Sequence, residues 1–253
     1  MPDHSPALAF ECVTKRFGAT TAVDAVSLDI AGGSFVALVG TSGSGKSTLL
    51  KTINRLIEPS DGRVTIDGTD VATGPAPDLR RRIGYVFQGI GLFPHMNVAE
   101  NIAIGLRLEG REAGGRAAEL LDLVDLPRDY ATRLPDALSG GQRQRVGVAR
   151  ALALKPRLML MDEPFGALDP VTRDQLCSAY RALHDRLGLT SVMVTHDMAE
   201  ALLLADRVLV MEAGCIVADA SPRDLLAGRG GAAAEALLAV PREQAARLAE
   251  LGQ

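Results

Sequence analysis

The stretch Gly40-Thr41-Ser42-Gly43-Ser44-Gly45-Lys46-Ser47-Thr48 follows an apolar run at residues 35–39 and leads directly into residues 49–53. Its spacing fits G-x-x-x-x-G-K-[ST], a loop whose glycine-rich backbone offers many amide donors to phosphates. A helix that opens at Lys46 adds the positive end of its dipole. Lys46 is expected to reach the β- and γ-phosphates, and the Ser47 hydroxyl to ligate Mg²⁺. The sequence therefore predicts a buried strand, a nucleotide-binding loop and a helix.

Length and composition are those of a globular chain. Its 253 residues are 47% hydrophobic and 23% charged, enough for a substantial core in a single or a lobed domain. The net charge of −4 argues against a broad basic face for nucleic acid. No apolar run approaches the roughly 18 residues of a membrane span, and the N-terminus lacks the pattern of a signal peptide. We therefore expect a cytoplasmic protein, in which any membrane role must come through a partner.

The first part of the chain favours strands. Residues 7–27 alternate loosely between apolar and polar side chains and are expected to form antiparallel strands. Phe17 precedes Gly18 and fits either the core or a stacking position on an adenine ring. The helix after the phosphate loop is expected to end near 58–62, and residues 73–77 to form a loop. Cys12, Cys177 and Cys215 lack metal-ligand spacing and are expected to be buried filler in a reducing compartment.

A second strand and a change to helical periodicity follow. Residues 83–87 are apolar, with Gln88 at the end of the predicted strand. Residues 89–96 are apolar but too rich in Gly and Pro for a helix, so this loop either packs under the domain or faces a partner. Asn97 and Glu100 resemble a capping box, and the chain from about 97 to 150 favours helices inserted between strands of an α/β sheet.

Ser139 begins the most informative of these helices. It is a good N-cap, and Gln142 completes a capping box. Gly140 and Gly141 leave the first amides of the helix open to an approaching anion. Taken alone, the motif fits a second anion-binding helix N-terminus and a merely well-capped helix equally well.

Carboxylates and a histidine follow two further buried strands. Asp162 and Glu163 come directly after the strand at 158–161, where they suit Mg²⁺ binding and proton abstraction respectively. Asp169 precedes a helix, and His196 follows the strand at 191–194, where a structural role is more common for a lone histidine. We further expect a hairpin at 207–219, a helix after Ser221 and a helical tail at about 228–253.

Together and in this order, the motifs resemble those of the ATP-binding cassette (ABC) ATPases, from Phe10 to about Leu226. The phosphate loop resembles Walker A, and residues 158–162 with Glu163 resemble Walker B and its catalytic glutamate. Residues 138–142 read Leu-Ser-Gly-Gly-Gln, the family signature without deviation. Residues 167–169 resemble the D-loop. The resemblance implies an α/β P-loop NTPase fold, with a RecA-like mixed sheet core, an N-terminal antiparallel β subdomain and an inserted α-helical subdomain, as one domain over 1–253.

The resemblance also implies roles for single residues. Gln88 takes the place of the Q-loop residue, His196 that of the switch histidine, and Phe17 that of the adenine-stacking aromatic, where the family more often has Tyr. Glu163, His196, Lys46 and Gln88 are the implied catalytic residues, and Ser47, Gln88 and Asp162 the implied Mg²⁺ ligands. The implied ATP contacts are Phe17, Gly40, Thr41, Ser42, Gly43, Ser44, Gly45, Lys46, Ser47, Thr48, Ser139, Gly140, Gly141, Gln142 and Asp169. Two copies would close head to tail around two ATP molecules.

A narrower resemblance concerns the cargo. Residues 41–48, 53–59, 83–88, 90–96 and 99–102 look like those of importer ATPases for osmoprotectants and other quaternary amines, such as glycine betaine, choline, carnitine and proline-type solutes. The implied partners are permease subunits and, indirectly, a substrate-binding protein, with this chain peripheral to the inner face of the membrane. Many such ATPases continue into a tandem regulatory domain, which is not expected here because the sequence stops at Gln253.

Other functions fit some of the same residues. An importer ATPase for another small solute (an amino acid, a polyamine or a sulfonate) and an exporter share all the motifs. Soluble ABC ATPases of DNA repair or translation usually carry two cassettes, a zinc module or a long coiled-coil insertion, whereas only residues 47–138 separate Lys46 from Ser139 here. A P-loop kinase or GTPase leaves the signature unexplained.

Overall fold

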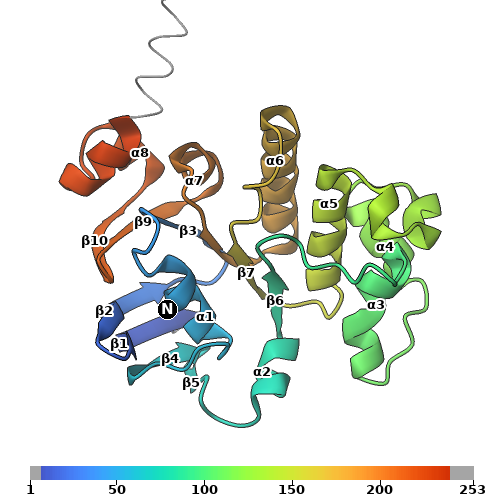
Figure 1. The fold of residues 1–253 in the computed structure, drawn as a ribbon, viewed down its shortest axis with the longest axis horizontal. Coiled ribbons are helices and arrows are strands. Elements are labelled where there is room, and N and C mark those ends of the chain that lie inside the picture. The colour runs from blue at the N-terminus through green and yellow to red at the C-terminus, as the bar shows by residue number, and fades with distance from the viewer. Residues whose placement is uncertain (1–6, 240–253) are drawn as a thin grey trace, which may run out of the picture. The chain divides into compact units, whose positions relative to one another are not determined.

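The computed structural model describes residues 7–239, in two compact units (Figure 1). The first unit comprises the chain up to Thr73 and from Met193 onward, and the second comprises Gly74–Val192. Strand β8 (Thr190–Val194) runs from the second unit into the first. The single domain expected over 1–253 stays a prediction. Within the expected tail at 228–253, residues 231–239 are helical and residues 240–253 lie outside the described part.

The first unit contains an antiparallel sheet in the order β2-β1-β4-β5. Its strands are β1 (Leu8–Phe17), β2 (Thr20–Ile30), β4 (Asp61–Ile66) and β5 (Thr69–Asp70). Leu8 pairs with Ile30 on one side and with Ile66 on the other. Leu8 and Ile30 are buried, and burial alternates along the last residues of β2, as in a strand with one face against the core. The strands expected at 7–27 are therefore confirmed, and β2 continues to Ile30.

A second group of strands in this unit flanks the phosphate loop. β3 (Phe35–Val39) is buried at every position and pairs in parallel with β9 (Arg207–Glu212). Such continuous burial is typical of a strand covered on both faces. β9 also pairs antiparallel with β10 (Cys215–Ala220), which confirms the hairpin expected at 207–219. The helices α1 (Lys46–Ile53), α7 (Met198–Leu204) and α8 (Pro222–Leu226) complete the labelled elements of this unit.

The expected end of the phosphate-loop helix near residues 58–62 is wrong, because α1 ends at Ile53. Arg55 has a φ of 55°, outside the range of a right-handed helix. The amide of Leu56 donates to Asn54 Oδ1 at 3.1 Å. A short polar side chain that bonds the backbone two residues ahead competes with continuation of the helix. At Asn54 this bond forms and α1 does not continue.

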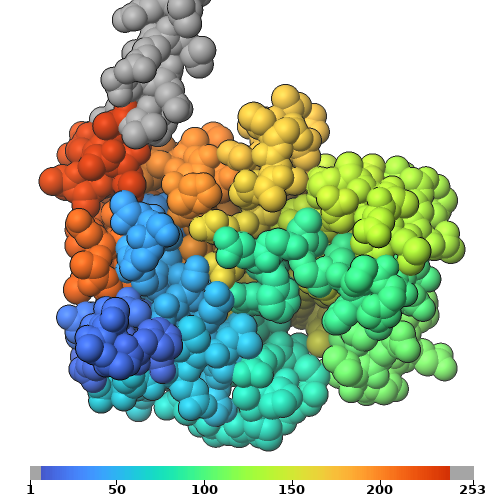
Figure 2. All heavy atoms as spheres, viewed as in Figure 1, coloured from blue at the N-terminus to red at the C-terminus, as the bar shows by residue number. Residues whose placement is uncertain are grey.

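Besides the start of β8, the second unit contains a pair of parallel strands and a lobe of helices. β6 (Ile83–Val86) pairs with β7 (Leu158–Asp162) from Ile83–Leu158 to Val86–Met161. The helices α3 (Val98–Leu108), α4 (Arg116–Leu123) and α5 (Gly140–Ala151) pack on one another, in green to yellow-green in Figures 1 and 2. The remaining helices are α2 (Ala76–Arg81), α6 (Pro170–Leu187) and the short 3-10 helices η1 (Arg128–Thr132) and η2 (Pro135–Ala137).

Local signals in this unit are mostly confirmed. Asn97 Oδ1 accepts from the amide of Glu100 at 2.9 Å, and Glu100 Oε2 accepts from the amide of Asn97 at 2.8 Å, so the predicted capping box is present. The loop expected at 73–77 is shorter than expected, because α2 begins at Ala76. Pro77 lies in the first turn of α2, where a helix needs no amide donor, so it does not prevent the helix.

Two further expectations concern the burial of the cysteines and the presence of membrane spans. Cys177 is buried and Cys215 partly buried, but Cys12 is exposed at an irregular point of β1, so the expectation of buried filler is wrong for Cys12. No helix within residues 7–239 has the length and apolar character needed to cross a membrane.

Candidate functional site

The phosphate loop of the first unit has a base at Gly40 and Ser44, which neighbouring backbone holds in place, and an exposed rim at residues 41–43. Gly40 has a φ of 151°, and a Cβ there would overlap the carbonyl oxygen of Met211. The amide of Gly214 donates to the carbonyl oxygen of Ser44 at 3.1 Å, so the turn between β9 and β10 supports the loop. Residues 41–43 are exposed, whereas Ser44 is buried. An anion can therefore approach the rim while the base keeps its shape.

Lys46 lies inside this loop and is 5% exposed. Its Nζ donates to the carbonyl oxygens of Gly40 at 2.8 Å and Thr41 at 2.7 Å, and to Ser44 Oγ at 3.3 Å. A buried ammonium needs acceptors for its protons, and these three oxygens supply them. The positive charge is thus held at the centre of the loop, as the sequence predicts for a phosphate-binding lysine.

His196 is exposed after the end of β8, in a turn held by hydrogen bonds. The amide of Thr195 donates to the carbonyl oxygen of Leu38 at 3.1 Å, near the end of β3. Thr195 Oγ1 donates to Glu200 Oε2 at 2.6 Å, and the Asp197 side chain caps α7. Within the first unit, His196 therefore follows a residue bonded to the strand that leads into the phosphate loop.

Phe17 ends β1 and is 50% exposed. Lys15 Nζ lies 5.1 Å from the centroid of its ring. A ring with half of its surface in solvent is not a core side chain, so the core interpretation is wrong. Adenine stacking stays a prediction that this exposure permits.

In the second unit, hydrogen bonds link the carboxylates of Asp162, which ends β7, and of Glu163, which follows it, to residues of β6 and just beyond it. Tyr85 Oη donates to Asp162 Oδ2 at 3.4 Å, and Gln88 Nε2 donates to Glu163 Oε2 at 3.2 Å. Because β6 and β7 are parallel, their carboxyl ends lie at one edge and bring these four residues together. Burial, followed by the neighbouring charge of Asp162, raises the pKa of Tyr85, so the phenol stays a donor.

Asp162 and Glu163 occupy different environments although they are adjacent in sequence. Asp162 is 2% exposed, whereas Glu163 is partly exposed. Glu163 also has a φ of 46°, a left-handed conformation that costs about 1–3 kcal/mol in a residue with a Cβ. Such backbone persists where neighbouring contacts hold it, and here it lies between the buried carboxylate of Asp162 and a Glu163 carboxylate that water can reach.

The start of α5 has the second predicted capping box. Ser139 Oγ accepts from the amide of Gln142 at 3.3 Å, and Gln142 Oε1 accepts from the amide of Ser139 at 2.9 Å. Ser139 is exposed. A Cβ on Gly140 would lie 3.5 Å from the Leu168 side chain, so the start of α5 lies beside the segment that leads into α6.

Asp169 caps α6 and is exposed. Its Oδ1 accepts from the amide of Thr172 at 3.0 Å. The hydrogen bonds from Thr172 lower the pKa of Asp169, because they favour the charged form. Asp169 is therefore an oriented, ionised group close in sequence to the Leu168 side chain that faces α5.

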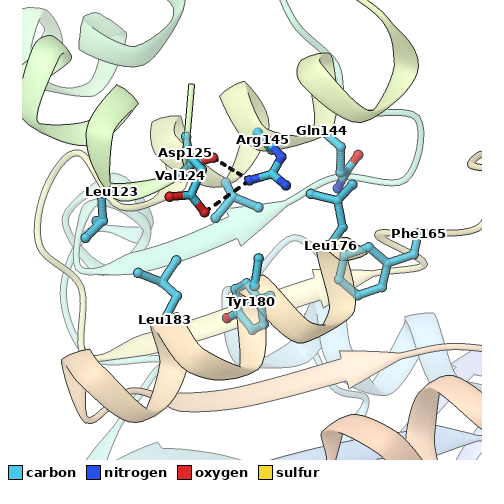
Figure 3. A pocket seen from close by; sticks show the side chains of 11 residues that line it. Leu123, Val124, Asp125, Gln144, Arg145, Phe165, Leu176, Tyr180 and Leu183 are labelled. Carbon is cyan, nitrogen blue, oxygen red and sulfur yellow. Dashed lines mark hydrogen bonds and ion pairs between the residues drawn. The ribbon is translucent and has the colours of Figure 1, made fainter. Parts of the chain in front are cut away.

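A small cavity lies within the second unit and contains none of the predicted site residues (Figure 3). Its volume is about 30 Å³, and Val124, Gln144 and Tyr180 are among its lining residues. Gln144 Nε2 is buried and has no hydrogen-bond partner among the described residues. A cavity of this size suits bound water, which can serve as that partner.

Sequence reasoning located most of the polar residues that the structure groups within each unit. It identified Gln88, Asp162 and Glu163 separately but missed Tyr85, which bonds to Asp162 from a neighbouring strand. The signal was present in the sequence, because Tyr85 lies in the predicted strand before Gln88.

The comparison with known proteins defines the class of this chain. Residues 23–166 match the family described as ABC transporter. The chain therefore belongs to the ABC transporter family, and membership implies that it binds ATP. Among solved structures, a dimeric form of the bacterial ABC transporter cassette MJ0796 matches with a TM-score of 0.77 and 36% identity, covering 85% of this chain and 99% of that one. The predicted ABC cassette fold is confirmed.

Curated relatives are similar over most of the chain. The glycine betaine/carnitine/choline transport ATP-binding protein OpuCA of Bacillus subtilis is 51% identical over 87% of this chain and 59% of its own length. The glycine betaine uptake system ATP-binding protein YehX of Escherichia coli is 49% identical over 87% of this chain and 72% of its own length. This chain thus spans less than two thirds of the Bacillus relative.

Proposed function

We propose that this chain is the ATP-hydrolysing subunit of an ABC importer that takes up osmoprotectants or other quaternary amines, such as glycine betaine, choline, carnitine or proline-type solutes. One observation carries the proposal. Over 87% of its length, the chain is 49–51% identical to proteins named for transport of glycine betaine, choline or carnitine.

The proposed nucleotide site uses the loop at 40–48 for the phosphates of ATP and Phe17 for its adenine. Lys46 would exchange its carbonyl acceptors in the loop for phosphate oxygens. Ser47, Gln88 and Asp162 offer hydroxyl, amide and carboxylate oxygens, which suit Mg²⁺. The fit is supported at Asp162, which is buried and oriented by the phenol of Tyr85. When bound, Mg²⁺ supplies positive charge against the γ-phosphate.

The proposed hydrolysis relies on positioning and charge rather than a covalent intermediate. Glu163 accepts a proton from the attacking water, and His196 contacts and positions the γ-phosphate. The Gln88 side chain could contact two groups, because its Nε2 donates to Glu163 and its Oε1 would bind Mg²⁺. Its side chain would thereby couple the metal to the general base.

A second copy of the chain completes each site in this proposal. The copies close head to tail, so that Ser139–Gln142 and Asp169 of one copy complete the site formed by the phosphate loop of the other. The exposure of Ser139 supports this role. So do two similar solved structures, a dimeric cassette and a dimeric post-hydrolysis state bound to ADP and Pi.

The proposed partners follow from the same relatives. Transport needs permease subunits and, indirectly, a substrate-binding protein, with this chain in the cytoplasm on the inner face of the membrane. The net charge of −4 supports a role without nucleic acid.

A sulfate importer is a second candidate, because the sulfate/thiosulfate import ATP-binding protein CysA of Rhodopseudomonas palustris is 49% identical over 84% of this chain. The test is to look for a permease and a binding protein encoded beside this chain, to purify them with it and to measure ligand binding by that binding protein. Affinity for glycine betaine or choline, together with solute-stimulated ATP hydrolysis, is the expected result. Affinity for sulfate would reassign the cargo, and absence of Mg²⁺-dependent hydrolysis would refute the ATPase.

The apolar loop after Gln88 is the proposed contact with the permease. Phe93 is 42% exposed. Its amide donates to Asn101 Oδ1 at 2.8 Å, so the buried Asn101 side chain holds the backbone that carries the exposed ring. Its exposure argues against simple packing under the helical lobe. We infer that Phe93 anchors a short cytoplasmic helix of the permease.

Phe93→Ala is expected to weaken complex formation and transport while the basal ATPase of the free subunit stays nearly unchanged. The measurement is co-purification with the permease alongside ATPase activity of the free protein. Leu134→Ala is the matched control, since Leu134 is a 50% exposed apolar residue of the same unit. Intact assembly and transport would rule out Phe93 as the anchor, and collapse of the free subunit would point to a packing role.

A further inference from the structure

The loop after Gln88 has an uncommon backbone. Gly89, Ile90 and Gly91 are all left-handed, with φ values of 76°, 69° and 58°. Glycine adopts this region freely, but Ile90 is β-branched, and its Cβ crowds the carbonyl oxygen that follows. A left-handed Ile90 therefore needs contacts from outside the loop to keep it in place.

Arg150, near the end of α5, makes such contacts. Its Nη1 donates to the carbonyl oxygen of Gly91 at 2.6 Å, and its Nη2 donates to that of Ile90 at 2.7 Å. The guanidinium carbon also lies 5.7 Å from the centroid of the Phe87 ring. A planar fork suits two successive carbonyl oxygens, whereas a lysine ammonium is a single point of charge. Burial lowers the pKa of Arg150, but an arginine still keeps its proton.

α5 touches the loop at a second point. Gly147 is buried, and a Cβ there would lie 3.2 Å from Ile90 Cγ2, closer than most real contacts of that kind. The absence of a side chain at Gly147 therefore lets Ile90 pack against the helix. The loop is held by its backbone at Arg150 and by its side chain at Gly147, both on α5.

This attachment joins two groups of the proposed ATP site. Gln88 immediately precedes the left-handed residues, and its Nε2 donates to Glu163 Oε2 at 3.2 Å. Ser139 caps the other end of α5. Because α5 is continuous from Gly140 to Ala151, a displacement of its start also moves Arg150.

We propose that Arg150 is a positioning residue that fixes the backbone after Gln88 to α5, so that movement of the Ser139 end of α5 is transmitted to the Gln88 side chain. The inference rests on the proposed ATPase function. Arg150 acts through Gln88, since its hydrogen bonds go to the loop carbonyl oxygens. Cooperation between the two ATP sites of a dimer would then depend on this link.

The test compares Arg150→Lys with Arg145→Lys. Arg145 lies on the same helix, and its Nη1 donates to the carbonyl oxygen of Val124 at 2.7 Å, away from the loop. The first measurement is amide hydrogen exchange at Ile90, whose N–H donates to the carbonyl oxygen of Phe87 at 3.0 Å. We expect about tenfold faster exchange in Arg150→Lys and no change in Arg145→Lys.

The second set of measurements comprises the rate of steady-state ATP hydrolysis and, separately, the affinity of the monomer for ATP. Misplacement of a catalytic side chain typically lowers kcat by roughly ten- to a hundredfold, so we expect that loss in Arg150→Lys, with ATP affinity and melting temperature preserved. The Hill coefficient for ATP should fall toward unity. Arg145→Lys should retain both kcat and cooperativity.

Each other outcome would contradict one step of the proposed coupling between α5 and Gln88. Unchanged exchange at Ile90 means that Arg150 does not hold the loop, whatever the chain hydrolyses. Faster exchange at Ile90 together with normal kcat and cooperativity would show that Arg150 holds the loop but does not position Gln88 for catalysis. A parallel loss of melting temperature and ATP affinity identifies a structural residue instead. If the wild-type chain hydrolyses no ATP, the proposed function fails, while the exchange result still decides whether Arg150 holds the loop.

A second variant tests the left-handed turn itself. Asn tolerates this conformation better than Ile, so Ile90→Asn combined with Arg150→Lys should recover part of the slow exchange and part of the lost kcat. Ile90→Asn alone shows the effect of losing the contact between Ile90 and Gly147. If that single variant behaves as wild type and the double variant still recovers neither quantity, Arg150 does not act by holding the left-handed backbone.

Discussion

Glu163→Gln is expected to bind ATP with near wild-type affinity and to hydrolyse it about 10²–10⁴-fold more slowly, because it loses its general base. The local structure should survive the change. Gln88 Nε2 donates to Glu163 Oε2, and the carbonyl oxygen of a glutamine can accept the same bond. The loss would therefore report the missing proton acceptor rather than a displaced side chain. With hydrolysis blocked, ATP should hold two copies together as a closed homodimer.

The measurements are steady-state ATPase activity, ATP binding and the mass of the protein with and without ATP. Glu112→Gln is the matched control, because Glu112 is an exposed carboxylate of the same unit, and it should behave as wild type. Near-normal turnover by purified Glu163→Gln would refute the assignment of the base. Slow turnover without an ATP-dependent dimer would support Glu163 as the general base but contradict the proposed closure of the dimer.

Expectations that depend on neighbours in sequence are the ones that the structure confirms. The capping boxes at Asn97 and Ser139 join residues only a helical turn apart, so the sequence contains both halves of each interaction. The phosphate loop was likewise predictable, since its strand, glycines and helix are contiguous. These local signals fix the order of the elements and thereby most of the fold class.

Errors arise where distant residues or competing local bonds decide. Asn54 ended α1 early by bonding the backbone, although the apolar pattern allowed a longer helix. The sequence could not decide between two roles for Phe17, because exposure depends on what packs around β1. Arg150 reaches carbonyl oxygens 59 and 60 residues away, and Tyr85 reaches Asp162 across 77 residues. The spacing of residues in a single sequence does not predict contacts over such distances along the chain.

Ser139→Arg is expected to abolish ATP hydrolysis while the monomer still binds ATP. Ser139 is exposed at the capped start of α5, where the proposal has it face the γ-phosphate held by the other copy. A bulky cation there would block closure of the dimer. The substitution also removes an N-cap, which costs about 0.5–2 kcal/mol of stability. Ser139→Ala loses the cap without the bulk, so this control should retain substantially more activity than the arginine variant.

Mixing Ser139→Arg with Lys46→Ala gives the sharper experiment. Lys46→Ala removes the ammonium that bonds the carbonyl oxygens of Gly40 and Thr41, and alone it should be inactive through failure of its own phosphate loop. In a head-to-tail heterodimer, one composite site carries both substitutions and the other carries neither. Partial recovery of ATPase activity on mixing two inactive variants is therefore the expected result, measured at several mixing ratios. Loss of ATP binding by the Ser139→Arg monomer would contradict the role across the dimer, because Ser139 would then belong to the site of its own copy.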